Sequence, residues 1–345
     1  WQARQKCPDI VFVSASHGRY GKFSKAAREI YNQYSDQVEP FGADEAFIDV
    51  TGSTHLFGSG ERIAHEIRRK MKGELGITVS VGVSWCKVFA KLASDMKKPD
   101  AVTVITTDDY REKVWPLAAQ EMIYVGPATT KKLNNVCIRT IGDIARQDPN
   151  YLKRMLGVHG YYLWKQASGL DDSAVAESTY KREPKSIGNS TTAPHDLITD
   201  NDIRITFLAL CESVATQLRE EGYKGRTVQI SIREIDLSWY QRQGKVPVAT
   251  SNAKDMLEMS LELLFRNRPK QPVRSLGVRA CDLIPTGETD QLSIFAGHQA
   301  SLKQHDLECT IDYIRGRYGY EAIRRGVVLL DEALDLDANS GERSN

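Results

Sequence analysis

The sequence predicts an α+β protein made of several domains, and three observations support this. Residues 1–108 alternate between strand-like and helix-like apolar patterns. Residues 109–172 carry helical spacing with tight glycine turns, and residues 185–285 follow the order strand, helix, strand, strand, helix, strand. With 345 residues, the chain is long enough for two or three domains.

The first segment is expected to hold strands and helices packed in two layers. Val- and Ile-rich stretches predict strands at residues 10–13, 47–50, 77–83 and 102–105. Helical spacing predicts helices at residues 23–34, 58–75 and 87–96, and Pro99 stops the last of them. These elements predict a mostly antiparallel sheet with helices on one face.

Two adjacent carboxylates, Asp44 and Glu45, precede the strand at residues 47–50. Neighbours on a strand point to opposite faces, but at a strand entry or a tight turn they can converge on one ion. Mg²⁺ takes oxygen ligands and usually shares them with substrate phosphates, and two such ions can hold both oxygens of a phosphoryl transfer. An Asp-Glu pair alone is more often a solvated acidic turn. The residues around the pair must therefore show whether it is a metal site.

The middle segment, residues 109–172, contains two helices around a glycine turn that includes Gly126 and continues to Lys132. Such a turn exposes backbone N–H groups that can hold a DNA phosphate without recognising sequence. A second, looser turn contains Gly157. The alternative is a helical connector whose glycines only cap helices.

The third segment follows a polar linker at residues 173–184 and opens with a strand containing Ser186 and Ile187. Further elements are expected as a helix from Thr199–Asp200 to about residue 221, strands at 226–233, 237–243 and 273–283, and a helix at 252–265. The order describes a four-stranded sheet backed by two helices, which also fits an isolated ferredoxin-like domain. Arginines that could hold a DNA backbone lie on or beside the strands: Arg226, Arg233, Arg274 and Arg279.

Composition and charge narrow the function classes. No apolar run reaches membrane-spanning length, and six scattered cysteines without a CxxC pair argue for a reducing cytoplasm rather than a zinc or disulfide site. The net charge is +1, but residues 1–285 carry 40 basic against 34 acidic residues, and residues 286–345 carry 6 against 11. A mildly basic body therefore precedes an acidic tail, which is a weak signal for DNA binding.

The motif Asp44-Glu45-Ala-Phe-Ile-Asp-Val-Thr, and the run Lys-Val-Phe-Ala-Lys-Leu-Ala-Ser-Asp-Met-Lys-Lys-Pro at residues 87–99, resemble the palm of Y-family translesion DNA polymerases of the bacterial DinB and UmuC branch. The resemblance runs through most of the chain. It implies a palm at residues 1–108, a helical thumb with a helix-hairpin-helix at 109–172 and a βαββαβ little finger at 185–285. The family's palm opens with another metal-binding Asp beside an aromatic steric gate, followed by fingers; we expect the palm here to be N-terminally incomplete and the fingers to be lacking.

The resemblance also implies roles for individual residues. Two Mg²⁺ ions would serve the reaction, with Asp44 as a ligand of the catalytic metal and Glu45 positioning the primer 3′-hydroxyl, while Lys98 would bind the triphosphate of the incoming dNTP. Lys87 and Lys91 stay undecided between surface and helix-packing roles. DNA contacts are expected at Gly126, Lys132, Ser186, Ile187, Arg226, Arg233, Arg274 and Arg279. Tyr124 replaces the family's first hairpin glycine, and Cys86 and Asp100 stand where the family often has Asn, which indicates a divergent branch.

A short motif after the third segment resembles the peptide by which bacterial polymerases bind the sliding clamp: Gln291, Leu292, Ser293, Ile294 and Phe295. The Gln offers a side-chain amide, and the apolar residues could anchor in a groove. A short core strand explains the same pattern.

The sequence thus predicts a monomeric, cytoplasmic polymerase that copies DNA past lesions, with primer-template DNA, dNTP and the sliding clamp as partners. We expect the 345-residue polypeptide itself to be inactive or nearly so, because it lacks the first metal-binding Asp of the family. The competing hypothesis is a non-catalytic DNA- and clamp-binding fragment or pseudo-polymerase. A helix-hairpin-helix repair nuclease is disfavoured, since it would not need the motif Lys98-Pro99.

Overall fold

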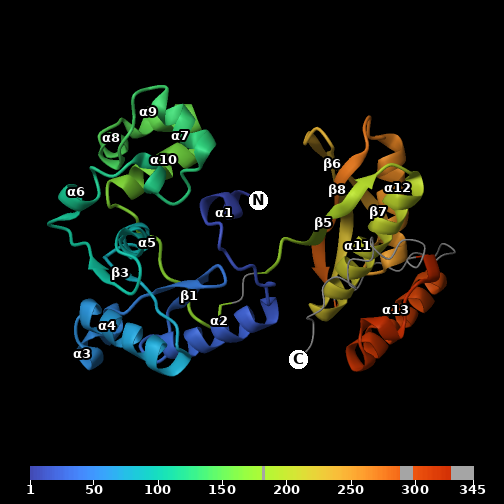
Figure 1. The fold of residues 1–345 in the computed structure, drawn as a ribbon, viewed down its shortest axis with the longest axis horizontal. Helices are drawn as coiled ribbons and strands as arrows, with labels where there is room; N and C mark the ends of the chain where they lie inside the picture. The colour runs from blue at the N-terminus through green and yellow to red at the C-terminus, as the bar shows by residue number, and fades with distance from the viewer. Residues whose placement is uncertain (181–182, 288–297, 328–345) are drawn as a thin grey trace. The chain divides into compact units, whose positions relative to one another are not determined.

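The structure, a computed structural model, describes residues 1–180, 183–287 and 298–327. The chain forms two compact units, the first ending at Lys181 and the second beginning at Arg182 (Figure 1). The described residues form two hydrophobic cores in the first unit and one in the second. In the described part of the chain, no helix is both long enough and apolar enough to cross a membrane.

The first unit contains two small sheets rather than the single, mostly antiparallel sheet that we predicted. Strand β1 (Val38–Phe41) pairs antiparallel with β2 (Glu45–Ile48), and β3 (Val81–Val83) pairs parallel with β4 (Val102–Val104). Residues 10–13 form no strand, so that prediction was wrong. Their side chains face solvent, with Val11 and Val13 82% and 86% exposed, because no described strand pairs with them.

The helices predicted at residues 23–34, 58–75 and 87–96 are present, the first two with other ends, and short helices at residues 2–6 and 54–57 were not predicted. In chain order, the helices are α1 (Gln2–Lys6) and α2 (His17–Tyr31); α3 (Thr54–Phe57) and α4 (Gly60–Lys70) follow, and a π-helical turn at Met71–Leu75 ends α4. Helix α5 (Lys87–Met96) has the predicted bounds. The middle segment adds α6 (Tyr110–Lys113), α7 (Pro127–Asn134), α8 (Ile141–Ala145), α9 (Pro149–Leu156) and α10 (Val158–Ala167).

Two cores divide the first unit differently from the predicted boundary at residue 108. Helices α2 and α4 share one core with β1, which includes Ile30 and Ile67. Helix α5 belongs to the other core, in which Phe89 and Leu92 pack with residues of the five later helices. Helix α5, which carries the second family motif, therefore lies before residue 108 in the chain but packs against helices that follow it.

Helix α5 lies unusually close to strand β3 because Gly82 has no side chain. A Cβ at Gly82 would stand 1.9 Å from the Ala90 carbonyl oxygen and 2.5 Å from the Ser94 backbone nitrogen. Any larger residue would therefore push the helix away from the strand. This contact sets the position of α5 relative to the sheet.

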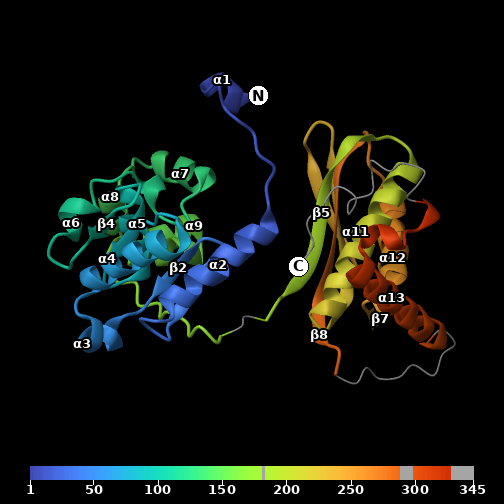
Figure 2. The same ribbon diagram turned by 60° about the horizontal axis from the view of Figure 1, so that its bottom comes forward.

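The second unit is a four-stranded antiparallel sheet in the order β5-β8-β6-β7. Its elements are β5 (Ser186–Leu197), α11 (Asp200–Glu220), β6 (Tyr223–Glu234), β7 (Trp239–Thr250), α12 (Ala253–Arg266) and β8 (Val273–Pro285). Helices α11 and α12 cover one face of the sheet (Figure 2), where alternate β6 residues such as Val228 and Ile230 are buried. This element order is the one that the sequence predicts, and Thr199 caps α11 as expected. The cap is a capping box that Thr199 forms with Asp202.

Helix α13 (His298–Tyr318) joins the second unit through buried charges. The Arg219 guanidinium on α11 binds Glu308 at 2.7 Å and Asp312 at 2.6 Å. Glu308 also accepts hydrogen bonds from the backbone N–H of Ala253, the first residue of α12. These polar contacts, together with Val327 packed on the core, hold the C-terminal part of the described chain to the sheet's helices.

Candidate active site

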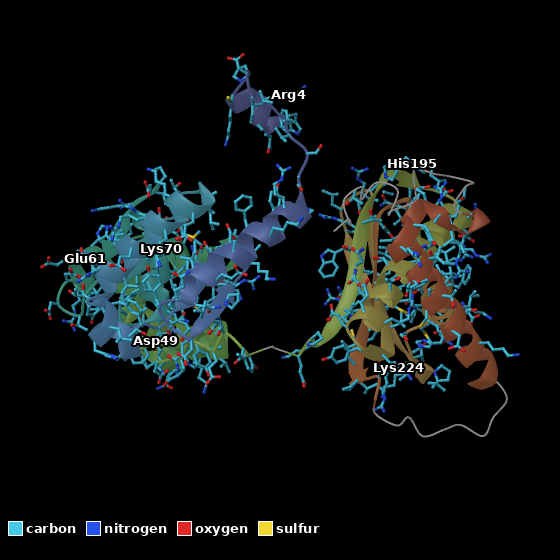
Figure 3. The ribbon with its side chains drawn as sticks, turned by 90° about the horizontal axis from the view of Figure 1, so that it is seen from below. Arg4, Asp49, Glu61, Lys70, His195 and Lys224 are labelled. Atoms are coloured by element: carbon cyan, nitrogen blue, oxygen red, sulfur yellow. The ribbon has the colours of Figure 1, made fainter. Side chains whose placement is uncertain are left out.

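The two carboxylates lie where strand β2 begins. A three-residue turn, Gly42-Ala43-Asp44, joins β1 to β2, and Gly42 adopts a φ of +84°, which favours glycine. Asp44 ends the turn and is exposed, while Glu45 is the first residue of β2 and pairs with Phe41. Asp49 (Figure 3) follows β2 and accepts a hydrogen bond from the backbone N–H of Thr51, so its carboxylate closes the next turn.

Helix α5 holds this hairpin through two lysines. Lys87 Nζ lies 2.5 Å from Glu39 Oε2 on β1, and Lys91 Nζ lies 2.9 Å from Glu45 Oε1 on β2. Both lysine side chains are only 14% exposed, and they lie one helical turn apart on the same face. The hairpin is therefore bound to α5 by one ion pair per strand. Glu39 also accepts the backbone N–H of Ala176 at 2.8 Å, which holds part of the predicted linker on the first unit.

An alternating row of charges continues from Glu45 to the end of α5. Lys91 Nζ also lies 2.7 Å from Asp95 Oδ2, and Lys98 Nζ lies 2.6 Å from Asp95 Oδ1. Burial acts to raise the pKa of Asp95, but hydrogen bonds from Lys91 and Lys98 outweigh it and lower that pKa. Burial acts to lower the pKa of Lys91, but its bonds to Asp95 and Glu45 outweigh it and raise that pKa. Asp95 and Lys91 are therefore both charged near neutral pH.

The end of α5 presents Lys98 toward solvent, with its side chain 55% exposed. The next residues turn sharply, because Asp100 has a φ of +53°. Its carboxylate binds Arg68, in the last turn of α4, at 3.2 Å. It also binds Lys72, in the π-helical turn that follows α4, at 3.4 Å. The Asp at this position, one of the departures from the family pattern, therefore ties the Lys98 turn to the neighbouring helix.

Asp44 and Glu45 supply the donor chemistry that a hard dication needs. Mg²⁺ is usually bound through one or two carboxylates together with substrate phosphates and water. Lys91 occupies Oε1 of Glu45, and no hydrogen bond to Oε2 is seen from any residue that the structure describes. Among residues 1–180, 183–287 and 298–327, no three His, Cys, Asp or Glu side chains gather to hold a metal. The pair thus fits an ion that takes its other ligands from substrate and solvent.

The predicted DNA contacts of the middle segment lie around the start of α7. Gly126 is the N-cap of this helix without a side-chain cap, Pro127 is its first residue, and Lys132 is exposed on its surface. Tyr124 has a φ of +70° and is 59% exposed. Helices α9 and α10 meet at Gly157, and a Cβ at Gly160 would lie 2.1 Å from the Leu152 carbonyl oxygen.

The residues of the second unit that we predicted to contact DNA do not all lie on the same face of the sheet. Arg233 and Arg279 stand on the sheet face opposite the helices, because they alternate with the buried residues of β6 and β8. Arg226 and Arg274 lie at register irregularities, and Arg274 is 3.7 Å from Asp196. Ser186 pairs with Cys281 on β8. Ile187 is buried in the core, so a DNA contact there could come only from its backbone.

Comparison with known proteins decides the family. The impB/mucB/samB family model matches residues 1–95, and its C-terminal domain model matches residues 184–294. DNA polymerase IV of Acetivibrio thermocellus is 48% identical over 336 residues, which cover 97% of this chain and 84% of that protein. The chain belongs to the Y-family of DNA polymerases. Its members are metal-dependent, DNA-directed nucleotidyltransferases that carry out translesion synthesis, so the predicted enzyme class is confirmed.

Other relatives and solved structures agree with this assignment. DNA polymerase IV of Pelotomaculum thermopropionicum is 36% identical and covers 95% of this chain and 81% of that protein. A Y-family polymerase chimera of Dbh and Dpo4 superposes with a TM-score of 0.70 at 24% identity, over 82% of each chain. An insertion ternary complex of Dbh DNA polymerase gives 0.54 over the same shares. These structures show that the polymerase has a Y-family fold.

The N-terminally incomplete palm stays a prediction, and the clamp motif Gln291–Phe295 lies outside the described residues.

Glu39 and Asp95 were not predicted as site residues from the sequence, and the roles of Lys87 and Lys91 were left undecided. The spacing Lys87, Lys91, Asp95 along one helical face was visible in the sequence. The partner of Lys87 on β1 and the partner of Lys91 on β2 were not visible, because they lie 48 and 46 residues away along the chain.

Proposed function

We propose that this polymerase extends a DNA primer on a template, past lesions, by two-metal transfer of a nucleotide from dNTP to the primer 3′-hydroxyl. The observation that carries the proposal is the row of charges that joins Glu45, beside Asp44, to Lys98 through Lys91 and Asp95. In this proposal Asp44 and Glu45 would hold the metal at one end of the row, and the solvent-facing Lys98 would hold the triphosphate at the other.

Within this array, each side chain has a task that its surroundings support. Asp44 and Glu45 would hold Mg²⁺, which when bound neutralises developing charge and activates the attacking oxygen. Lys98 would bind oxygens of the triphosphate as a point charge, since its ammonium is solvent-facing. Asp95 keeps that ammonium near the site before the nucleotide arrives.

We propose that two surfaces hold the DNA backbone without recognising its sequence, as a helix-hairpin-helix and a little finger would. The first is the α7 start with Gly126 and Lys132, where uncapped backbone N–H groups favour phosphate. The second is the open face of the sheet in the second unit, which carries Arg233 and Arg279. Sequence-independent contacts of this kind position the duplex and leave base selection to the template.

We also propose that Gln291–Phe295 binds the sliding clamp and that the polymerase acts as a monomer. The support is the residue pattern, a Gln followed by apolar anchors. Phe295→Ala should abolish capture of the polymerase by immobilised clamp while primer extension without clamp is unchanged. Equal capture of both proteins would refute the assignment.

Template-directed primer extension tests the proposed reaction. The full-length protein with Mg²⁺ should add the nucleotide that is complementary to the template, and chelation of Mg²⁺ should stop it. Full-length protein that binds primer-template but never extends it would favour the competing hypothesis, a DNA- and clamp-binding scaffold.

A further inference from the structure

The β1–β2 hairpin depends on side chains of α5 for its position. Lys87 binds β1 through Glu39 and Lys91 binds β2 through Glu45, and both lysines are largely buried. Lys87 also lies 5.6 Å from the centre of the Phe47 ring on β2. The two ion pairs are alike in type and burial, but only that of Lys91 involves a residue of the proposed metal pair.

We propose that Lys91 is a positioning residue that fixes the Glu45 carboxylate in its working orientation. The inference rests on the proposed function, because it assigns Glu45 to the metal site. Lys91 donates to Oε1 of Glu45 at 2.9 Å. One oxygen is thus engaged by the protein, while the other stays available to a ligand.

Lys91 itself has little freedom to move. Its ammonium is anchored a second time, at 2.7 Å from Asp95 Oδ2 on the next turn of α5. Neighbouring α5 side chains Val88 and Leu92 are buried in the core, and the backbone of α5 lies against Gly82. The position of Lys91 is therefore set by the core of the first unit, and Lys91 transmits it to Glu45.

A positioning role and a metal-holding role predict opposite effects on metal affinity. Removing the Lys91 ammonium takes a positive charge away from the cation site and frees Oε1, so a dication should bind as tightly or more tightly. The carboxylate would then lose its fixed rotamer, and misplacement of a reacting group lowers turnover steeply. A positioning residue therefore combines unimpaired metal binding with slow turnover, whereas a residue that held the metal would not.

The test compares Lys91→Met with Lys87→Met in the full-length polymerase. Mn²⁺ binding is titrated without DNA or nucleotide, and kcat and KM for dNTP are measured by primer extension. Lys91→Met should keep or tighten the Mn²⁺ affinity and lower kcat roughly 10- to 100-fold, with KM changed less than about threefold. Lys91→Arg, which can still donate to Glu45, should restore most of kcat. Lys87→Met removes a matched ion pair but leaves Glu45 held, so its kcat should fall less than about threefold.

Other outcomes of this comparison would overturn either the positioning role of Lys91 or the assignment of Glu45 to the metal. Equal losses of kcat in Lys91→Met and Lys87→Met would show that both lysines only fasten the hairpin, and would overturn the inference. So would weakened Mn²⁺ binding by Lys91→Met. Glu45→Gln separates the inference from the proposed function: if that variant keeps both Mn²⁺ affinity and kcat, the metal assignment fails whatever Lys91 does. Thermal unfolding of every variant identifies loss of fold, and the Lys91→Arg variant then carries the test.

Discussion

Replacing Gly82 by alanine should damage the active site from a distance. The added Cβ would stand 1.9 Å from the Ala90 carbonyl oxygen, whereas ordinary contact begins at 3.4 Å, so α5 must withdraw from β3 by about 1.5 Å. The atom in the way belongs to the helix backbone, which cannot swing aside as a side chain can. Overpacking of this kind costs about 1–3 kcal/mol of unfolding free energy.

The withdrawal should also reach the catalytic groups. Helix α5 carries Lys91, which holds Glu45 at 2.9 Å, and it ends next to Lys98. A shift of about 1 Å in the geometry of a site can lower turnover on the order of 100-fold. We therefore expect Gly82→Ala to retain its fold and to lose most of its primer-extension rate.

Urea unfolding followed by far-UV circular dichroism gives the stability, and primer extension at saturating dNTP gives the rate. Gly73→Ala is the matched control, because nothing lies within 4 Å of its Cβ position and its φ is not positive. That control should be neutral or stabilised by about 0.5–1 kcal/mol. If Gly82→Ala were as stable and as fast as the control, the close contact of α5 with β3 would not position the site.

Three further predictions concern charge. Arg219→Met leaves Glu308 and Asp312 without their buried partner and should cost the second unit roughly 3–5 kcal/mol, measured by urea unfolding; an unchanged midpoint would refute the ion network. The pKa of Asp95 is lowered in the folded state, so its ion pairs stabilise above the unfolded pKa of about 3.9 and are lost as pH falls through the lower, folded pKa. Asp95→Asn should therefore flatten the acid side of the stability profile, and equal acid sensitivity would contradict this. Arg233→Ala or Arg279→Ala should weaken duplex binding for every sequence and reduce its salt slope by about 1, whereas an unchanged slope would remove the open sheet face from the interface.

Local signals were enough where a helix or its cap is determined by near neighbours. The bounds of α5 follow from its apolar spacing and from Pro99, and the start of α11 follows from Thr199 and its capping box. The predicted strand at residues 10–13 failed because a Val-rich stretch becomes a strand only beside a partner strand. Strand β7 runs to Thr250 rather than residue 243, because pairing with β6 sets its length.

The residue types of the candidate site could be predicted from the sequence, but the contacts between its side chains could not. Asp44 and Glu45 were correctly expected at the entry of a strand, since turn residues precede a β-branched run. The role of Lys91 was left open, because its partner Glu45 lies 46 residues earlier in the chain. Ile187 was expected at DNA, but the side-chain alternation of β5 places it in the core. Long-range pairing, which no local pattern encodes, accounts for the gap at Lys91. The burial of Ile187 follows the alternation of its own strand, which the prediction did not apply.

The most direct test of the central claim is Mg²⁺-dependent primer extension by Asp44→Ala and Glu45→Ala variants of the full-length polymerase, with duplex binding measured on the same samples. Both carboxylates lie on the hairpin rather than in a core, so the variants should fold and bind primer-template as the unaltered protein does. Extension should be abolished in both variants while duplex affinity is retained. Extension at the unaltered rate by either variant would contradict the assignment of Asp44 and Glu45 to the metal site.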